Sequence, residues 1–244
     1  VAFRAPARWT NTGQNLSAGR DCVEEVEHAR PRRWGGRLDD RARFDNLFFH
    51  ISRREALTMD PQERLFLECA FRTLEDAGYT RQRLARFRAG VCVGVMYGHH
   101  VLYGVEAGGT ARPLPNSSFA NIANRVSYFC DLRGPSLAVD TMCSSSLTAL
   151  HLAVTSLRQG ESDVMLVGGV NVAVHPYKYE LLREGGFLSS DGRCRSFGKG
   201  GDGYVPGEGV AALLLKPLAR ALADGDMIHA SSARPAVEPR RPSD

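Results

Sequence analysis

One stretch in the middle of the sequence constrains the fold more than any other, because it alternates between strand and helix. Residues 136–140 have the pattern of a short strand, and a sharp turn follows at Thr141-Met142-Cys143. The next residues have the apolar spacing of a helix, which Gly160 is placed to end, and residues 163–174 return to a buried strand. The expected apolar face of the helix consists of Leu147, Leu150, Val154 and Leu157. A strand, a helix and a strand in succession form a parallel crossover unit, so the sequence predicts an α/β fold.

Further helices and strands are predicted on both sides of this unit. Asp60 is placed as a helix N-cap, with Pro61 at the first helical position and Glu63 three residues after the cap. The apolar stripe of this helix would be Leu65, Phe66, Ala70, Leu74 and Ala77, and Gly78 would end it. The other predicted elements are strands at 91–96 and 210–216 and helices at 119–128 and 217–223. Loops are expected at 30–43, 97–109 and 191–208, and residues 1–15 show no regular period.

Composition excludes several classes of protein. With 244 residues and 43% hydrophobic content, the chain can bury the core of one large domain or two small ones. The formal net charge of +4 is not gathered into a basic stripe, so no nucleic-acid partner is expected. No apolar run is long enough to span a bilayer and no signal peptide is evident, so no membrane association is expected. The 6 cysteines have neither Cys-x-x-Cys nor zinc-ligand spacing, which predicts free thiols, a reducing cytoplasmic setting and no metal.

Cys143 is the residue to which the pattern assigns chemistry, because it stands where a buried strand ends and a helix begins. Unpaired N–H groups and the helix dipole at such a position favour the thiolate and lower the pKa of the thiol. The same N–H groups could hold the oxyanion that forms when a thiolate attacks a thioester. Asp140 is expected to cap the helix or to fix the turn, and the serines at 144–146 to satisfy the first helical turn. The alternative is that Cys143 is one more buried structural cysteine.

Several segments together resemble the β-ketoacyl synthases. The segment Val139-Asp140-Thr141-Met142-Cys143-Ser144-Ser145-Ser146-Leu147 resembles the nucleophile segment of that family. The segments at 48–56, 59–65, 123–128 and 168–171 look like the ketosynthase domains of modular polyketide synthases. Two more, at 175–179 and 189–197, are more similar to assembly lines that a separate acyltransferase serves. The resemblance covers residues 13–230, between a divergent segment at 1–12 and a Pro- and Arg-rich tail at 231–244 that is expected to be disordered.

The resemblance implies a thiolase-like fold, in which two similar α/β halves form α-β-α layers, and a homodimer. It also implies that Cys143 accepts an acyl chain from the phosphopantetheine arm of an acyl carrier protein. A malonyl-type carrier thioester would then condense with that chain, with loss of carbon dioxide, in polyketide or fatty-acid-like biosynthesis. The chain itself would bind no cofactor, because the substrates travel on the carrier protein.

The sequence also departs from the family. Family members carry two catalytic histidines in the second half, one in a His-Gly-Thr-Gly-Thr segment and one in a Gly-His segment after a lysine. Neither segment occurs in this sequence, and the family's usual first strand is not evident in residues 1–12. We therefore expect the N-terminal half of a ketosynthase, with the second half missing through truncation, a frameshift or a split gene. Without the histidine pair, this chain alone is expected to perform no condensation.

Two other functions are compatible with the same residues. A non-catalytic ketosynthase remnant could act as a scaffold for dimerisation or for docking a carrier protein, because the exposed apolar face of a half-domain favours pairing with another chain or a complementary half. A thioester hydrolase with a cysteine nucleophile ranks last, because the sequence places no base near Cys143. The glycines at 198–203 match a dinucleotide-binding pattern, but no strand-helix-strand unit surrounds them, so they are interpreted as tight turns.

Overall fold

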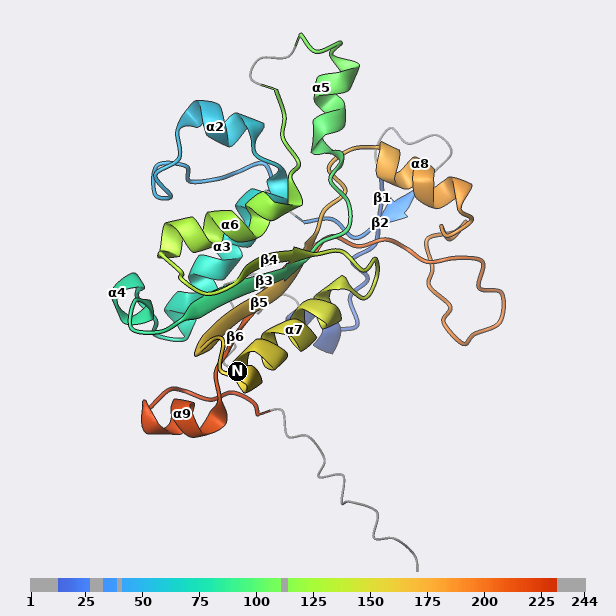
Figure 1. Ribbon diagram of the computed structural model, residues 1–244. Helices are drawn as coiled ribbons and strands as arrows, with labels where there is room; N and C mark the ends of the chain where they lie inside the picture. The colour runs from blue at the N-terminus through green and yellow to red at the C-terminus, as the bar shows by residue number, and fades with distance from the viewer. Residues whose placement is uncertain (1–12, 27–32, 39–40, 111–113, 232–244) are drawn as a thin grey trace, which may run out of the picture.

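A four-stranded mixed sheet forms the centre of the chain in the computed structural model, which describes residues 13–26, 33–38, 41–110 and 114–231 (Figure 1). Its strands are β3 (Ala89–Gly94), β4 (Ser136–Val139), β5 (Val164–Asn171) and β6 (Gly209–Leu215), in the order β4-β3-β5-β6. Strand β3 runs parallel to both β4 and β5, whereas β5 runs antiparallel to β6. The parallel crossover that the sequence predicts is therefore present.

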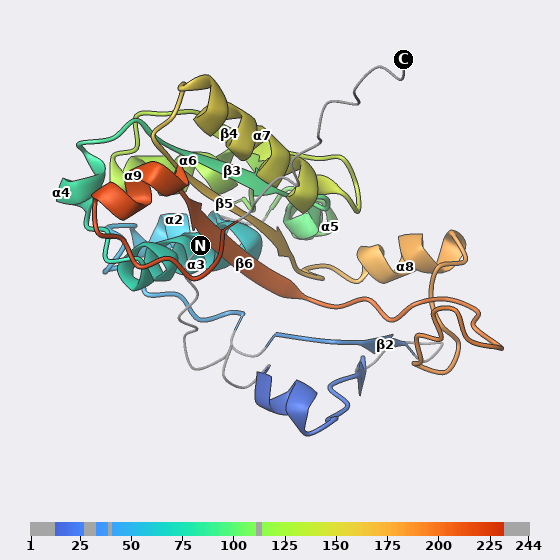
Figure 2. The same ribbon diagram turned by 90° about the horizontal axis from the view of Figure 1, so that it is seen from below.

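Helices cover both faces of the sheet, so the described chain has three layers (Figures 1 and 2). Helices α3 (Pro61–Asp76) and α6 (Phe119–Cys130) pack on one face, and α7 (Ser145–Gln159) packs on the other. The larger core lies under α3 and α6, around the fully buried Phe66, and the smaller core lies under α7, around Ala149. This arrangement agrees with the predicted α/β class in α-β-α layers.

Short elements surround these layers. They are β1 (Glu24–Glu25), β2 (Trp34–Gly35), α2 (Arg53–Thr58), α4 (Arg81–Leu84), η1 (His99–Val101), α5 (Leu102–Glu106), α8 (Tyr177–Glu184) and α9 (Leu218–Ala223). Strands β1 and β2 pair antiparallel. Within the described ranges, no helix is both long and apolar enough to cross a membrane. The predicted N-terminal segment at 1–12 and all but the first residue of the predicted tail at 231–244 lie outside the described residues.

The start of α3 shows how local sequence sets an element. Asp60 is the N-cap, and its carboxylate accepts a hydrogen bond from the backbone N–H of Gln62 at 2.9 Å. Pro61 occupies the first helical position, and Gly78 follows the helix with a φ of +69°. Glu63 turns its carboxylate to the side chain of Arg125 and so joins α3 to α6. The predicted boundaries of this helix are confirmed.

Regular structure is present in several segments where the sequence predicted none. Residues 13–17 are helical, β2 lies within the loop expected at 30–43, and both η1 and α5 lie within the loop expected at 97–109. Helix α8 has no counterpart among the predicted elements. Contacts that are remote in sequence explain part of this difference, because the Tyr103 hydroxyl on α5 donates to the backbone carbonyl of Val174 at 2.8 Å. A local pattern cannot reveal a partner so far along the chain.

The face that α7 buries also differs from the predicted one. Its buried residues are Ser145, Ala149, Ala153 and Ser156. The helix lies very close to the sheet, since a Cβ on Gly94 would be 2.5 Å from the backbone nitrogen of Ser146. Only small side chains fit beneath a helix held so closely. Leu147 is therefore 72% exposed, and the other predicted leucine and valine positions pack at the margin of the smaller core.

Candidate active site

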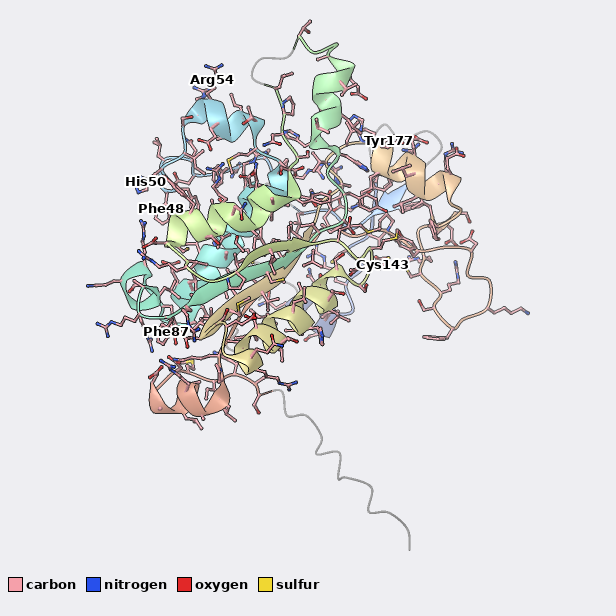
Figure 3. The ribbon with its side chains drawn as sticks, in the orientation of Figure 1. Phe48, His50, Arg54, Phe87, Cys143 and Tyr177 are labelled. Carbon is pink, nitrogen blue, oxygen red and sulfur yellow. The ribbon has the colours of Figure 1, made fainter. Side chains whose placement is uncertain are left out.

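Cys143 lies in a sharp turn between β4 and α7, and α7 begins two residues after it (Figure 3). The turn passes through Met142, whose φ of +57° lies in the left-handed region that residues with a side chain rarely adopt. The carboxylate of Asp140 accepts a hydrogen bond from the backbone N–H of Met142 at 2.9 Å. Asp140 therefore fixes the turn, which is one of the two roles predicted for it.

Hydroxyl groups at the start of α7 hold the other side of this turn. The Ser145 hydroxyl accepts a hydrogen bond from the backbone N–H of Thr141 at 2.9 Å and donates one to the backbone carbonyl of Met142 at 2.6 Å. The Ser144 hydroxyl donates to the backbone carbonyl of Thr141 at 2.8 Å and makes no cap bond to the helix. The prediction that the serines satisfy the first helical turn is thus corrected for Ser144 and Ser145, which bond the turn that carries Cys143.

The thiol of Cys143 is exposed and lines a cavity of about 300 Å³. The cavity wall includes Tyr97 after β3, Asn171 at the end of β5, Lys178 on α8 and Tyr204. Burial raises the pKa of both tyrosine hydroxyls, and negative charge on Cys143 adds to the shift, so the phenols are neutral at neutral pH. Because the sulfur is exposed, the interpretation of Cys143 as a buried structural cysteine is wrong.

The cysteines divide into an exposed group and a shielded group. The exposed group is Cys22, Cys143 and Cys194, and the shielded group consists of Cys69, which is partly buried, and Cys92 and Cys130, which are buried. All of them are free thiols. Burial raises the pKa of the Cys69, Cys92 and Cys130 thiols to about 11 in each case. These thiols are therefore poor candidates for nucleophiles.

We expect a thiol reagent at pH 8 to label Cys143 and the other exposed cysteines of the folded chain. The same pulse should leave Cys69, Cys92 and Cys130 unmodified. At that pH a thiol with a pKa of about 11 is only about 0.1% thiolate, and its sulfur is also shielded from the reagent. Peptide mass spectrometry after a short pulse of iodoacetamide measures this division. A urea-unfolded sample, in which every cysteine reacts, is the control. Rapid labelling of Cys92 or Cys130 in the folded chain would contradict it.

The structure adds to the site a charged residue that sequence reasoning missed. Lys178 is only 4% exposed and lines the same cavity as Cys143. Its ammonium group donates a hydrogen bond to Oδ1 of Asn171 and lies 4.8 Å from the centre of the Tyr97 ring. Burial lowers the pKa of Lys178 to about 8. The only sequence signal was the segment at 175–179, whose pattern does not mark a buried lysine.

The glycines at 198–203 form turns, as interpreted from the sequence. Gly200 has a φ of +79° and the preceding Phe197 a φ of +62°, and the next regular element is the strand β6. A phosphate-binding loop of the dinucleotide type would lead directly into a helix. This segment therefore lacks the geometry of a dinucleotide site.

Comparisons with known proteins bear on this site. A family model described as "Beta-ketoacyl synthase, N-terminal domain" matches residues 5–221. The chain is 53% identical over 234 residues to the polyketide synthase ThaG of Burkholderia thailandensis, covering 88% of this chain and 4% of that protein. It is 52% identical over 241 residues to the polyketide synthase PksL of Bacillus subtilis, covering 88% of this chain and 5% of that protein. The chain therefore spans only a small part of the length of these relatives.

Solved structures show the same likeness. The oxazolomycin ketosynthase domain OzmH KS7 of Streptomyces albus superposes with a TM-score of 0.85 at 53% identity, covering 90% of this chain and 42% of that chain. The ketosynthase from module 6 of the bacillaene synthase of Bacillus subtilis superposes with a TM-score of 0.81 at 40% identity, covering 90% of this chain and 38% of that chain. The predicted thiolase-like fold, limited to its N-terminal half, agrees with this partial coverage of ketosynthase domains.

Proposed function

The chain belongs to the β-ketoacyl synthase family, whose N-terminal domain it matches, and from this membership we propose that Cys143 accepts acyl chains in a polyketide assembly line. One observation carries the proposal. The thiol is exposed on a turn that Asp140 and Ser145 hold in place, and it opens onto a cavity of about 300 Å³. A nucleophile held rigidly beside a cavity is what repeated acyl transfer requires.

The proposed reaction moves an acyl group from the thioester of a phosphopantetheine arm to Cys143. The thiol loses its proton to solvent, and the sulfur attacks the carbonyl carbon of the thioester. The backbone N–H of Cys143 stabilises the oxyanion, the carbon–sulfur bond to the arm breaks, and the leaving sulfur takes up a proton. An acyl carrier protein presents the arm, so this chain needs no bound cofactor. The segments at 175–179 and 189–197 support an assembly line that a separate acyltransferase serves.

We do not assign carbon–carbon bond formation to these residues. The resemblance implies two catalytic histidines, in segments that these 244 residues do not contain. Without them, no imidazole pair polarises the malonyl thioester and assists the loss of carbon dioxide. We therefore propose that these residues perform acyl transfer alone and that condensation needs a complementary part of a ketosynthase.

Two surfaces support association with such a part or with a second copy. A groove of about 700 Å³ lies between α7 and β6, and its apolar lining includes Leu147, Leu150 and Leu213. Strand β4 is one edge of the described sheet, where Leu137 is exposed. Apolar surface of this kind favours a protein partner. The same surfaces favour the second candidate function, a non-catalytic scaffold that pairs with another ketosynthase or docks a carrier protein.

Acylation of Cys143 separates the two functions. We expect intact-protein mass spectrometry to show one acyl adduct after incubation with a short acyl-pantetheine thioester, and we expect Cys143→Ala to lose it completely. Cys22→Ala, which removes another exposed thiol, is the matched control and keeps the adduct. Addition of a malonyl carrier thioester is expected to give no β-ketoacyl product.

Three results would count against acyl transfer. An adduct that persists in Cys143→Ala would place the reaction on another residue. A folded parent chain with no adduct would favour the scaffold. Formation of β-ketoacyl product by the purified chain would overturn the division between transfer and condensation.

A further inference from the structure

The cavity beside Cys143 contains one cationic side chain among the described residues that line it, that of Lys178. A buried ammonium group is costly unless acceptors replace the water it has lost. The structure supplies two partners, the Oδ1 atom of Asn171 and the face of the Tyr97 ring at 4.8 Å. An ammonium group has three N–H donors, so Lys178 retains capacity for another acceptor.

The carboxylate whose charge acts on Lys178 does not take up this capacity. Glu208 raises the pKa of Lys178 through its charge, whereas the hydrogen bonds that its side chain accepts come from other described residues. It accepts from the side chain of Arg41 and from the backbone N–H groups of Leu38 and Ala173. The Lys178 ammonium therefore lines the cavity with a donor to spare.

Position within the cavity indicates what that acceptor is. Lys178 lines the same cavity as Cys143, together with Tyr97 and Tyr204. A chain attached to Cys143 would enter this cavity, so an oxygen atom on that chain is an acceptor placed to meet the ammonium group.

We propose that Lys178 is a specificity-determining residue whose ammonium donates a hydrogen bond to a hydroxyl or carbonyl oxygen on the acyl chain carried by Cys143. This inference rests on the proposed function and names its substrate class. A purely alkyl chain would leave the buried ammonium without that acceptor. A site built around a buried donor rejects an analogue that lacks the matching oxygen.

The first test does not depend on acyl transfer. In a Cys22→Ser/Cys194→Ser background, Cys143 is alkylated with haloacetamides whose chains carry a hydroxyl at successive positions, each compared with the methyl analogue. We expect the hydroxyl at one position to raise the Tm of the adduct above that of its methyl analogue. The rise should disappear in Lys178→Met and persist in part in Lys178→Gln, which keeps a donor. Equal Tm values for every pair in the parent would overturn the inference.

The second test measures acylation directly. We expect the oxygenated acyl-pantetheine to acylate Cys143 of the parent about tenfold faster than the alkyl acyl-pantetheine does. A hydrogen bond from a charged donor is worth about this factor. In Lys178→Met the ratio of the two rates should fall to about one. A ratio near one in the parent would count against Lys178. If no acyl-pantetheine acylates Cys143 but the hydroxyl chain still raises the Tm of the alkylated protein, the proposed function would be overturned. The contact between Lys178 and the oxygen would still stand.

If Lys178→Met does not fold, the parent still decides the question. Incorporation of lysine labelled with ¹³C at Cε gives each lysine an NMR signal that reports its surroundings and leaves its three N–H donors intact. The Lys178 signal, assigned through Lys178→Gln, should shift on alkylation with the hydroxyl chain and move much less with the methyl chain. Identical shifts with both chains would overturn the inference.

Discussion

Replacing Gly94 by alanine is expected to lower the rate of Cys143 acylation about a hundredfold, the typical cost of moving a reactive group by about 1 Å. Gly94 ends β3 directly beneath the start of α7. A Cβ there would lie 2.5 Å from the backbone nitrogen of Ser146 and 2.6 Å from the carbonyl carbon of Ser145. Backbone cannot yield as a flexible side chain can, so the first turn of α7 must move. Because Ser145 bonds the turn at Thr141 and Met142, the sulfur moves with it.

The same substitution is expected to lower the free energy of unfolding by about 1–3 kcal/mol, because it overpacks the layer between helix and sheet. Urea unfolding measures the stability, and the rate of acyl-adduct formation measures the position of the thiol. Gly209→Ala is the matched control, since a Cβ at that strand position meets nothing within 4 Å. If Gly94→Ala leaves the acylation rate within about twofold of the parent and the free energy of unfolding within about 0.5 kcal/mol, the close approach of α7 does not position Cys143.

Features set by neighbouring residues could be predicted from the sequence. The start of α3 depends on Asp60 and Pro61, and each acts within one helical turn. The turn at Cys143 was predicted for the same reason, because a strand, a left-handed turn and a helix follow one another without interruption. The chemical candidate therefore follows from the local sequence, whereas its cavity does not.

Features set by distant residues could not be predicted. The buried face of α7 depends on the close approach to Gly94, which belongs to another element. Lys178 is buried only because α8 folds over the ends of β3 and β5, and α8 itself was not predicted. Periodicity reports which face of an isolated helix is apolar, but close packing decides which face is buried.

The structure also gives a physical reason for three of the segments that carry the family resemblance. Glu55 lies in the segment at 48–56, Glu63 in that at 59–65 and Arg125 in that at 123–128. In the fold they meet, since the guanidinium of Arg125 contacts Glu55 at 2.7 Å and Glu63 at 3.0 Å. This cluster ties α2, α3 and α6 together on the face of the sheet opposite α7. We therefore interpret these three residues as stabilising the fold and not as taking part in acyl transfer.

Arg125→Ala is accordingly expected to lower the free energy of unfolding by about 3–5 kcal/mol at pH 7.5, the usual cost of removing one partner from a buried ion pair. The Glu63 side chain is only 3% exposed, so loss of the guanidinium leaves a buried carboxylate without its counter-charge. Arg133→Ala is the matched control. Its partner is Asp131, both side chains are largely exposed, and a change of less than about 1 kcal/mol is expected.

The pH dependence of this loss tests its cause. Burial raises the pKa of Glu63 above 4.5 even beside Arg125, and removing the positive charge raises it further. A carboxyl group with a raised folded-state pKa binds a proton more readily when folded, so its stabilising contribution is present at low pH and is lost as pH rises through that pKa. The penalty of Arg125→Ala should therefore shrink as pH falls from 7.5 to 5, and adding Glu63→Gln should reduce it at pH 7.5. A penalty that is independent of pH and unchanged by Glu63→Gln would mean that Arg125 stabilises the fold by packing its aliphatic part and not by neutralising Glu63.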